Sequence, residues 1–310
     1  MDTPLAGANI LTIQDLDKDR MLLILNRAAN LEASLQKRWG APLIPGRIMA
    51  LLFYEPEPWV RSSFESAMLR LGGRVLSIAG LDLRVADGDS HALARAAQIA
   101  SGQADVIVHR HPEVFSAHES ANGARVPLIN AGDGTHEHPT QALADLYTIR
   151  RERGVLDGLS IAIIGDLRRS RSAHSLARAL AHWDVTLRLV SPASLKMAKV
   201  ITVPLKRSVP LVETDDLSSG LEGCDVLCTT PIDDRHFARP SDAAQARERC
   251  TISRALAERL GSDVLVIPSR EGEFGVEPEA LARGAYRRQA LDAVWVRMAI
   301  LALVLGAPPP

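Results

Sequence analysis

The feature that most constrains the fold is an alternation of short apolar runs with segments of helical periodicity along almost the whole chain. In the first half, three apolar runs predict buried strands, at 48–54, 105–108 and 126–130. Helical patterns lie around them, at 17–38, 61–71, 93–100 and from about Pro139 onward. Alternation of this kind is typical of parallel sheets covered by helices on both faces.

The second half repeats the alternation. Four further runs predict strands: LSIAIIGD, VTLRLVSP, DVLCTTP and DVLVIPS. SRSAHSLARALAHW predicts a helix, and the strongly apolar segment 287–306 predicts a buried final helix. The fold class is therefore predicted to be α/β, with two doubly wound parallel-sheet domains. The polar, turn-like RRERGVLDG suggests a boundary, giving domains at 1–150 (joined by the C-terminal helix, 287–310) and 151–286.

Composition excludes several classes of protein. A net charge of -1 gives no field that would recruit nucleic acid or an anionic membrane, so neither is an expected partner. A hydrophobic content of 46% excludes wholesale disorder, and no apolar run is long enough to span a bilayer. The three cysteines lack metal-site spacing with histidine and are an odd number, so we expect reduced thiols, no metal and a cytoplasmic protein.

Ligands of parallel sheets bind beyond the carboxyl ends of the strands, and three polar residues stand there in the first half. Arg110 ends a strand, while His138 and Gln141 share one face at the start of the next helix. Together they could hold and polarise a carbonyl group. Taken singly, Arg110 could form a surface ion pair, and His138 could be satisfied by its loop. Arg171 begins the first helix of the second half. It could bind substrate, or it could be an ordinary surface charge.

Cofactor motifs are absent from the sequence. IIGDLRRSRSAHS joins a strand to a helix at a glycine but lacks the further glycines of a dinucleotide loop, and there is no P-loop. We therefore expect no cofactor.

Several motifs, in order along nearly the whole chain, carry a resemblance to a known family. They are FYEP, RSSFESAMLRLGG, RHP, INAGDGTHEHPTQALADLYTI, IAIIGD and VRMAILAL, and together they resemble the catalytic chain of aspartate carbamoyltransferase. The resemblance implies a carbamoyl-phosphate-type first domain and an amino-acid-binding-type second domain. It also implies a homotrimer with active sites shared between neighbouring subunits, and it makes Arg110, His138, Gln141 and Arg171 the carbonyl-facing and substrate-facing residues.

The chain departs from the family pattern at its phosphate loop. Where the family has Ser-Thr-Arg-Thr, this sequence has Glu57, Pro58, Trp59 and Val60, and Arg61 then continues the family pattern. A carboxylate in place of hydroxyls and a guanidinium predicts loss of several charge-assisted contacts to phosphate, each worth roughly 1.5–3 kcal/mol.

Other substrate-binding positions also differ. Asp87 aligns with a family lysine, and Asp233 stands near the family's arginine–glutamine element, with Arg235 close by. Arg270 replaces a proline of a histidine–proline loop. We therefore expect a changed substrate pocket, lined by Glu57, Trp59, Arg61, Asp87, Asp233, Arg235 and Arg270.

Three hypotheses follow, and the first is the favoured one. The chain is an enzyme of this type that acts on a different small molecule containing a carbonyl or carboxamide. Alternatively, it is a catalytically silent chain that supports or regulates another carbamoyltransferase or pathway enzyme. In the third hypothesis it is a genuine aspartate carbamoyltransferase of pyrimidine biosynthesis.

Overall fold

A computed structural model describes residues 4–35, 42–78, 91–260, 263–268 and 286–308. The chain divides into two compact units. The first unit comprises Met1–Ala144 and Leu291–Pro310, and the second unit comprises Asp145–Ala290. The divisions fall inside two helices, α5 (Pro139–Arg153) and α12 (Tyr286–Val304), a few residues from the expected boundaries.

The first unit is built on a four-stranded parallel sheet in the order β2-β1-β3-β4. Its strands are β1 (Ile48–Phe53), β2 (Arg74–Ser77), β3 (Val106–His111) and β4 (Leu128–Asp133). β1 and β3 are central and buried at most positions, as expected of parallel strands that are covered on both faces.

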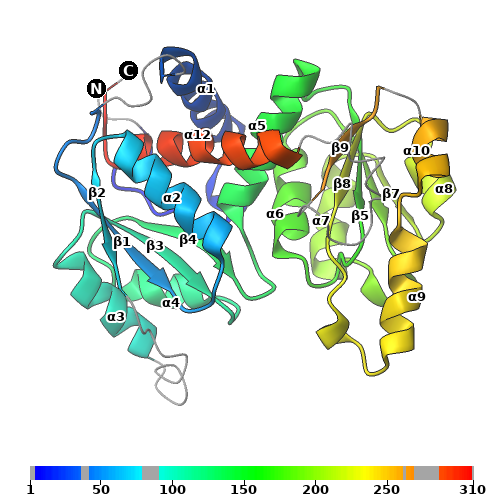
Figure 1. Ribbon diagram of the computed structural model, residues 1–310, viewed down its shortest axis with the longest axis horizontal. Coiled ribbons are helices and arrows are strands. Elements are labelled where there is room, and N and C mark those ends of the chain that lie inside the picture. The colour runs from blue at the N-terminus through cyan, green and yellow to red at the C-terminus, as the bar shows by residue number, and fades with distance from the viewer. Residues whose placement is uncertain (1–3, 36–41, 79–90, 261–262, 269–285, 309–310) are drawn as a thin grey trace. The chain divides into compact units, whose positions relative to one another are not determined.

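Helices cover both faces of this sheet (Figure 1). On one face, α3 (Ala92–Ser101) and α4 (Ser116–Gly123) share a core with alternate residues of β1 and β3, including Ala50, Leu52 and Ile107. On the other side lie α2 (Pro58–Arg70) and the C-terminal helix α12. The Arg297 guanidinium of α12 stacks on the Phe64 ring of α2, 4.9 Å from its centroid. The helix α1 (Lys18–Leu35) follows the short helix η1 (Ile13–Asp15).

The second unit holds a five-stranded parallel sheet in the order β7-β6-β5-β8-β9. The strands are β5 (Ser160–Ile164), β6 (Thr186–Val190), β7 (Leu211–Thr214), β8 (Val226–Thr229) and β9 (Leu265–Ile267). Its helices are α6 (Arg171–Leu180), α7 (Lys199–Ser208), α8 (Leu217–Leu221), α9 (Pro240–Cys250) and α10 (Arg254–Leu260), with the short η3 (Ala193–Leu195) and η4 (Asp234–His236).

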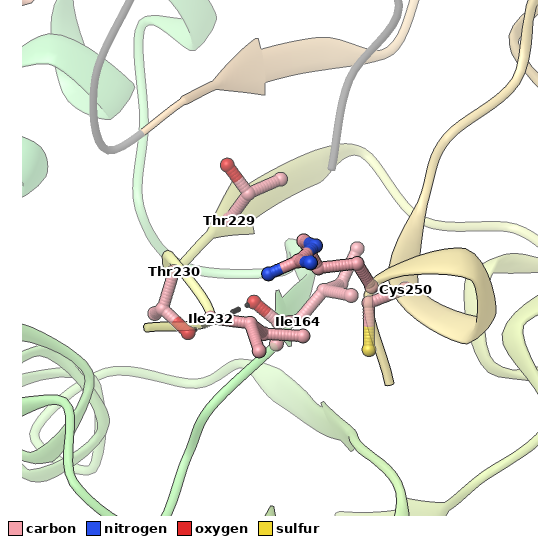
Figure 2. Close-up of a pocket in the computed structure, with 7 residues that line it drawn as sticks. Ile164, Thr229, Thr230, Ile232 and Cys250 are labelled. Atoms are coloured by element: carbon pink, nitrogen blue, oxygen red, sulfur yellow. Dashed lines mark hydrogen bonds between the residues drawn. The ribbon is translucent and has the colours of Figure 1, made fainter. Parts of the chain in front are cut away.

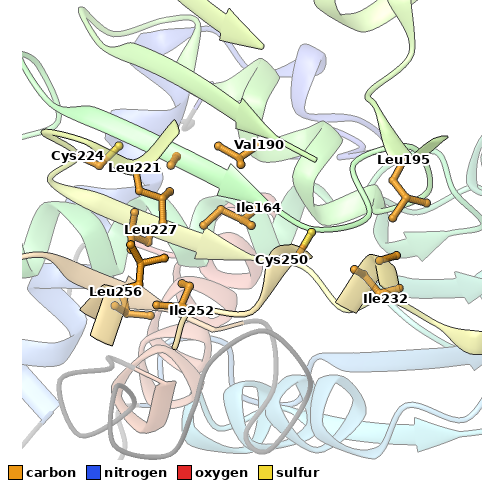
Figure 3. Close-up of a cluster of buried hydrophobic side chains, with 13 residues drawn as sticks. Ile164, Val190, Leu195, Leu221, Cys224, Leu227, Ile232, Cys250, Ile252 and Leu256 are labelled. Carbon is orange, nitrogen blue, oxygen red and sulfur yellow. The ribbon is translucent and has the colours of Figure 1, made fainter. Parts of the chain in front are cut away.

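The core on one face of this second sheet gathers side chains from β5, β8, α8 and α9 (Figure 3). Ile164, Leu227 and Ile252 are at most 1% exposed. Two of the chain's cysteines, Cys224 and Cys250, belong to this cluster as small apolar residues.

The prediction of an α/β protein with two parallel sheets flanked by helices is confirmed. The boundaries of three elements were wrong. The helix expected from Arg61 begins at Pro58, because a proline is favourable in a first helical turn. The strands expected to end at Val108 and Asn130 run on to His111 and Asp133, because their polar side chains find buried partners.

Within the described part of the chain, no helix combines the length and apolar character needed to cross a membrane.

Candidate active site

The carboxyl ends of β1 and β3 bring Arg110 to two carboxylates. Arg110 Nη2 lies 2.8 Å from Glu55 Oε1 and 3.3 Å from Glu57 Oε2, and Nη1 donates to the Ala131 carbonyl at 2.9 Å. Arg110 is 5% exposed, so its ion pairs are buried rather than on the surface. Because the guanidinium is held on both sides of its fork, its direction at the end of the sheet is fixed.

His138 and Gln141 stand where β4 leads into α5. His138 directly precedes α5 and is buried, and its carbonyl accepts the Gln141 backbone N–H at 3.1 Å. Its Nδ1 lies 3.4 Å from the Thr140 hydroxyl. β3 and β4 are neighbours in the sheet, so Arg110, near the end of β3, and the two residues that follow β4 belong to adjacent parallel strands.

The first turn of α2 carries the other expected residues of the first unit. Glu57 is the N-cap residue, but its carboxylate makes no cap hydrogen bond and instead reaches Arg110. Trp59 is 76% exposed. Arg61 pairs with Glu65 along the helix, at 3.1 Å, and lies over the Phe53 ring. The structure therefore brings Glu57 to Arg110, whereas Arg61 is engaged by its own helix.

A buried histidine pair next to this group was missed in the sequence. His109 is fully buried, with Nε2 3.1 Å from the Ser116 hydroxyl and Nδ1 3.2 Å from the Ser120 hydroxyl. Burial, helped by the neighbouring His111, lowers the pKa of His109 to about 3, against a smaller opposing effect of Asp133. Burial also raises the pKa of Tyr54, whose ring packs on both histidines, to about 12. These groups are therefore neutral near pH 7.

In the second unit, Arg171 is the first residue of α6, directly after the N-cap Ser170, whose hydroxyl accepts the Ala173 N–H. Asp166, which was not among the predicted site residues, lies two residues after β5 and is 2% exposed. It accepts the backbone N–H groups of Arg168 and Arg169 at 3.1 Å each. An acid directly after an apolar run that predicts a strand was the signal that could have identified it.

Asp233 and Arg235 form a pair of their own at η4. Asp233 accepts the Arg235 backbone N–H at 2.9 Å, and Arg235 Nη2 lies 2.5 Å from Asp233 Oδ2. The hydrogen bond from Arg235 lowers the pKa of Asp233 to about 2. Arg235 itself is 87% exposed. The other two expected residues, Asp87 and Arg270, lie outside the described residues.

A small pocket of the second unit opens where β5 and β8 end (Figure 2). Thr230 Oγ1 donates to the Ile164 carbonyl there at 3.2 Å. The lining is mainly apolar and contains none of the expected site residues: Ile164, Gly165, Thr229, Thr230, Ile232, Arg247 and Cys250. Its one charged side chain, Arg247, pairs with Asp234.

One group of described side chains has the composition of a metal site. His118, Asp133 and His136 place one donor atom each within 4.8 Å of one another, on the first unit. Sequence reasoning missed this group because His118 comes from a helix that was not predicted.

Comparison with known proteins identifies the family. Two family domains match: the carbamoyl-P binding domain of aspartate/ornithine carbamoyltransferase over residues 8–151, and the Asp/Orn binding domain over residues 157–304. The chain belongs to the aspartate/ornithine carbamoyltransferase family. The resemblance noted in the sequence is thereby confirmed.

Relatives of this chain match it over nearly their full lengths. Aspartate carbamoyltransferase catalytic subunits of Thermoplasma acidophilum and Thermococcus gammatolerans are 37% and 39% identical, with 97% of this chain and 99% and 98% of theirs covered. The structure of aspartate transcarbamoylase from Trypanosoma cruzi, in complex with carbamoyl phosphate and aspartate, is 32% identical, with a TM-score of 0.88 and 98% of both chains covered.

These findings overturn the favoured functional hypothesis. The expectation that the chain acts on a different carbonyl or carboxamide compound was wrong, because its near full-length relatives and structural neighbours are aspartate carbamoyltransferases. That expectation gave too much weight to four residues, Glu57 to Val60. The strand, turn and helix that carry those residues are present, with α2 beginning at Pro58.

Proposed function

We propose that this chain is an aspartate carbamoyltransferase, which transfers a carbamoyl group from carbamoyl phosphate to the amino group of aspartate in pyrimidine biosynthesis. One observation carries the proposal: catalytic subunits with this activity in their names match 97% of the chain at 37–39% identity. The presence of Arg110, His138 and Gln141 at neighbouring strand ends supports it.

The roles of the first-unit residues follow from their chemistry. The Arg110 guanidinium, His138 and the Gln141 amide donate hydrogen bonds to the carbonyl oxygen of carbamoyl phosphate and stabilise the negative charge that develops on it. The aspartate nitrogen attacks the carbonyl carbon, and the carbon–oxygen bond to phosphate breaks. Phosphate leaves with the bonding electrons and accepts the proton that the amine loses.

In the second unit, Arg171 and Arg235 are the candidates for binding the aspartate carboxylates, because a guanidinium fork matches a carboxylate. Arg235 must exchange Asp233 for the substrate, since the two are paired at 2.5 Å. Trp59, Arg61, Asp87 and Arg270 remain proposed substrate contacts on the strength of their positions in the sequence alone.

A silent chain is the second candidate, and one contact favours it. The Glu57 carboxylate occupies one side of the Arg110 fork at 3.3 Å, where it repels an anionic substrate. In this case the chain would assemble with an active carbamoyltransferase or another pathway enzyme without turning over substrate.

The deciding experiment measures carbamoyl aspartate formed from carbamoyl phosphate and aspartate. We expect product with the parent chain and a loss of at least about 100-fold in kcat with Arg110→Ala or His138→Ala. Arg239→Ala is a matched control, because Arg239 is a surface residue that pairs with Asp242. Absence of product from folded protein at millimolar substrate contradicts the proposal and supports the silent chain.

Assembly and location follow from the same relationship. We infer a homotrimer, as implied by the resemblance to the catalytic chain. A cytoplasmic location is supported by the free state of all three cysteines, which are buried.

A further inference from the structure

We propose that His118, Asp133 and His136 form a binding site for a divalent transition-metal ion, with Zn²⁺ as the best fit. The three residues lie on one side of the first unit, on α4, at the end of β4 and in the turn that follows it. The site is separate in chemistry from the proposed carbamoyl transfer, which uses no metal.

The donor atoms are already gathered. One donor from each residue lies within 4.8 Å of the other two. Tetrahedral Zn²⁺ with nitrogen and oxygen ligands at about 2.0–2.2 Å needs donors roughly 3.3–3.6 Å apart. A separation of 4.8 Å has to shorten by roughly 1.2–1.5 Å, which rotation of a half-buried imidazole can supply.

His118 contributes an unused donor. Among the described residues, its buried Nδ1 has no hydrogen-bond partner. A buried polar atom in this state costs free energy, so a ligand that accepts its lone pair is stabilising. Its ring also contacts those of Phe115 and His136, with centroids 6.1 and 5.7 Å away, which restricts its orientation.

Asp133 and His136 already lie within hydrogen-bonding distance of each other where a metal would lie. His136 Nδ1 is 3.1 Å from Asp133 Oδ2, and this carboxylate is fully buried. The other oxygen, Oδ1, accepts hydrogen bonds from Asn130 Nδ2 at 2.9 Å and from the Glu137 N–H at 3.1 Å. Oδ1 therefore orients the group, which is the outer-shell arrangement seen around metal ligands, and leaves Oδ2 for the ion.

The backbone holds the two ligand segments together. Gly134 N–H donates to the His111 carbonyl at 2.9 Å, and a Cβ on Gly134 would lie 2.6 Å from Val114 N. Only glycine lets this turn lie so close to the segment that leads into α4. The backbone therefore fixes the distance between the turn that carries His136 and the segment that leads to His118.

The ligand set selects the ion. Two imidazoles and one carboxylate suit zinc and neighbouring first-row metals, and they leave a coordination position for water. Mg²⁺ and Ca²⁺ prefer sites made of oxygen ligands, so neither should compete. His136 is two residues before His138, so a bound ion would brace the segment that positions His138.

The test measures Zn²⁺ binding to the chelator-treated full chain by calorimetry, with a competing zinc indicator as a second readout. We expect one Zn²⁺ per chain, little effect of millimolar Mg²⁺, and a rise in Tm of about 5 °C or more at a hundredfold excess over Kd. Co²⁺ should give the visible absorption of a tetrahedral site.

Variants decide where the ion binds. His118→Asn and His136→Asn should each weaken Zn²⁺ binding at least about 30-fold, whereas His182→Asn, at an exposed histidine of the second unit, should leave it unchanged. Circular dichroism in chelator shows whether each variant is folded. Asn is chosen because it keeps a polar side chain at each position. Substoichiometric binding, or equal binding by parent and both variants, overturns the proposal whether or not the chain transfers carbamoyl groups.

Discussion

At the scale of single residues, the environment of Arg110 decides how the proposed site meets an anion. Two carboxylates, Glu55 and Glu57, lie against one guanidinium that is 5% exposed. A substrate phosphate or carbonyl oxygen must compete with them, because Arg110 has a limited number of donors. Glu57 is the more dispensable of the two, since it lies farther from Arg110, at 3.3 Å against 2.8 Å.

Glu57→Gln should therefore lower the KM for carbamoyl phosphate, by about tenfold, which corresponds to about 1.4 kcal/mol. The reason is that the change removes a negative charge near the anion while it keeps the size of the side chain. Steady-state kinetics, or calorimetry with carbamoyl phosphate alone, measures the effect. Glu258→Gln, at a surface pair with Arg254, is the control and should leave KM unchanged. A higher KM for Glu57→Gln would show that Glu57 assists binding.

His109 makes the first unit sensitive to acid. Its pKa is about 3 in the folded state and near 6.5 when unfolded, so below pH 6.5 the unfolded chain binds a proton that the folded chain does not. Its contribution to stability is present above pH 6.5 and is lost as the pH falls toward 3. Burial also lowers the pKa of His111, which acts in the same direction.

We expect the free energy of unfolding to decrease as the pH is lowered from about 6 to about 4. His109 contributes up to about 1.4 kcal/mol of this decrease per pH unit. Urea denaturation at several pH values measures this slope. His109→Asn should make this slope shallower, because about one proton fewer is bound on unfolding. The substitution also lowers stability at pH 7, because the contacts with Ser116 and Ser120 are lost. The exposed His182→Asn is the control. An unchanged slope in His109→Asn would show that another group dominates acid unfolding.

At the scale of elements, the turn after β5 depends on one glycine. Gly165 has a φ of +117°, and a Cβ there would lie 2.3 Å from the Thr230 carbonyl oxygen. This approach lets the segments after β5 and β8 lie side by side, joined by the hydrogen bond from Thr230 N–H to the Ile164 carbonyl at 2.7 Å. The pocket of Figure 2 is built at this junction.

Gly165→Ala should destabilise the second unit by roughly 2–4 kcal/mol, because it combines backbone strain with a clash against main-chain atoms. Gly223→Ala is a matched control: its φ is +67°, and a Cβ there would have no described atom within 4 Å. It should cost about 1 kcal/mol. Urea denaturation followed by circular dichroism measures both costs. Equal costs for the two changes would mean that the contact with Thr230 relaxes freely.

At the scale of the whole molecule, each unit has its own parallel sheet and its own hydrophobic core. The chain's relatives are named as catalytic subunits, which is consistent with an assembly larger than one chain. The first unit is completed by Leu291–Pro310, so the end of the chain is part of the same unit as its beginning.

Light scattering after size exclusion should give a mass about three times the 33.5 kDa of one chain at micromolar concentration. The expectation rests on the family resemblance, whose catalytic chains form trimers with shared active sites. Dilution to nanomolar concentration serves as the control for weak association. A stable trimer should be fully assembled at about 10 μM. A monomeric mass at or above this concentration contradicts the trimer.

The sequence by itself determined the fold class, because strand and helix patterns are local: apolar runs and helical spacing can be identified without knowing what they contact. It also predicted Arg110, His138 and Gln141 as residues of one site, because parallel strands bring their carboxyl ends together. Short elements such as β2 and β7 were missed, since their residues are half-buried or exposed and carry no apolar run. Helix α4 was missed for lack of a strong pattern.

Only the tertiary structure decided which side chains meet. Glu57 and Arg110 are 53 residues apart, and His118 meets Asp133 and His136 across α4 and β4. Such contacts depend on strand order, on register and on the direction of each side chain, which no local pattern encodes. The identity of four loop residues suggested a different substrate, and comparison over the whole chain corrected it. Residue types limit the chemistry that a site can do, whereas packing sets which of those residues act together.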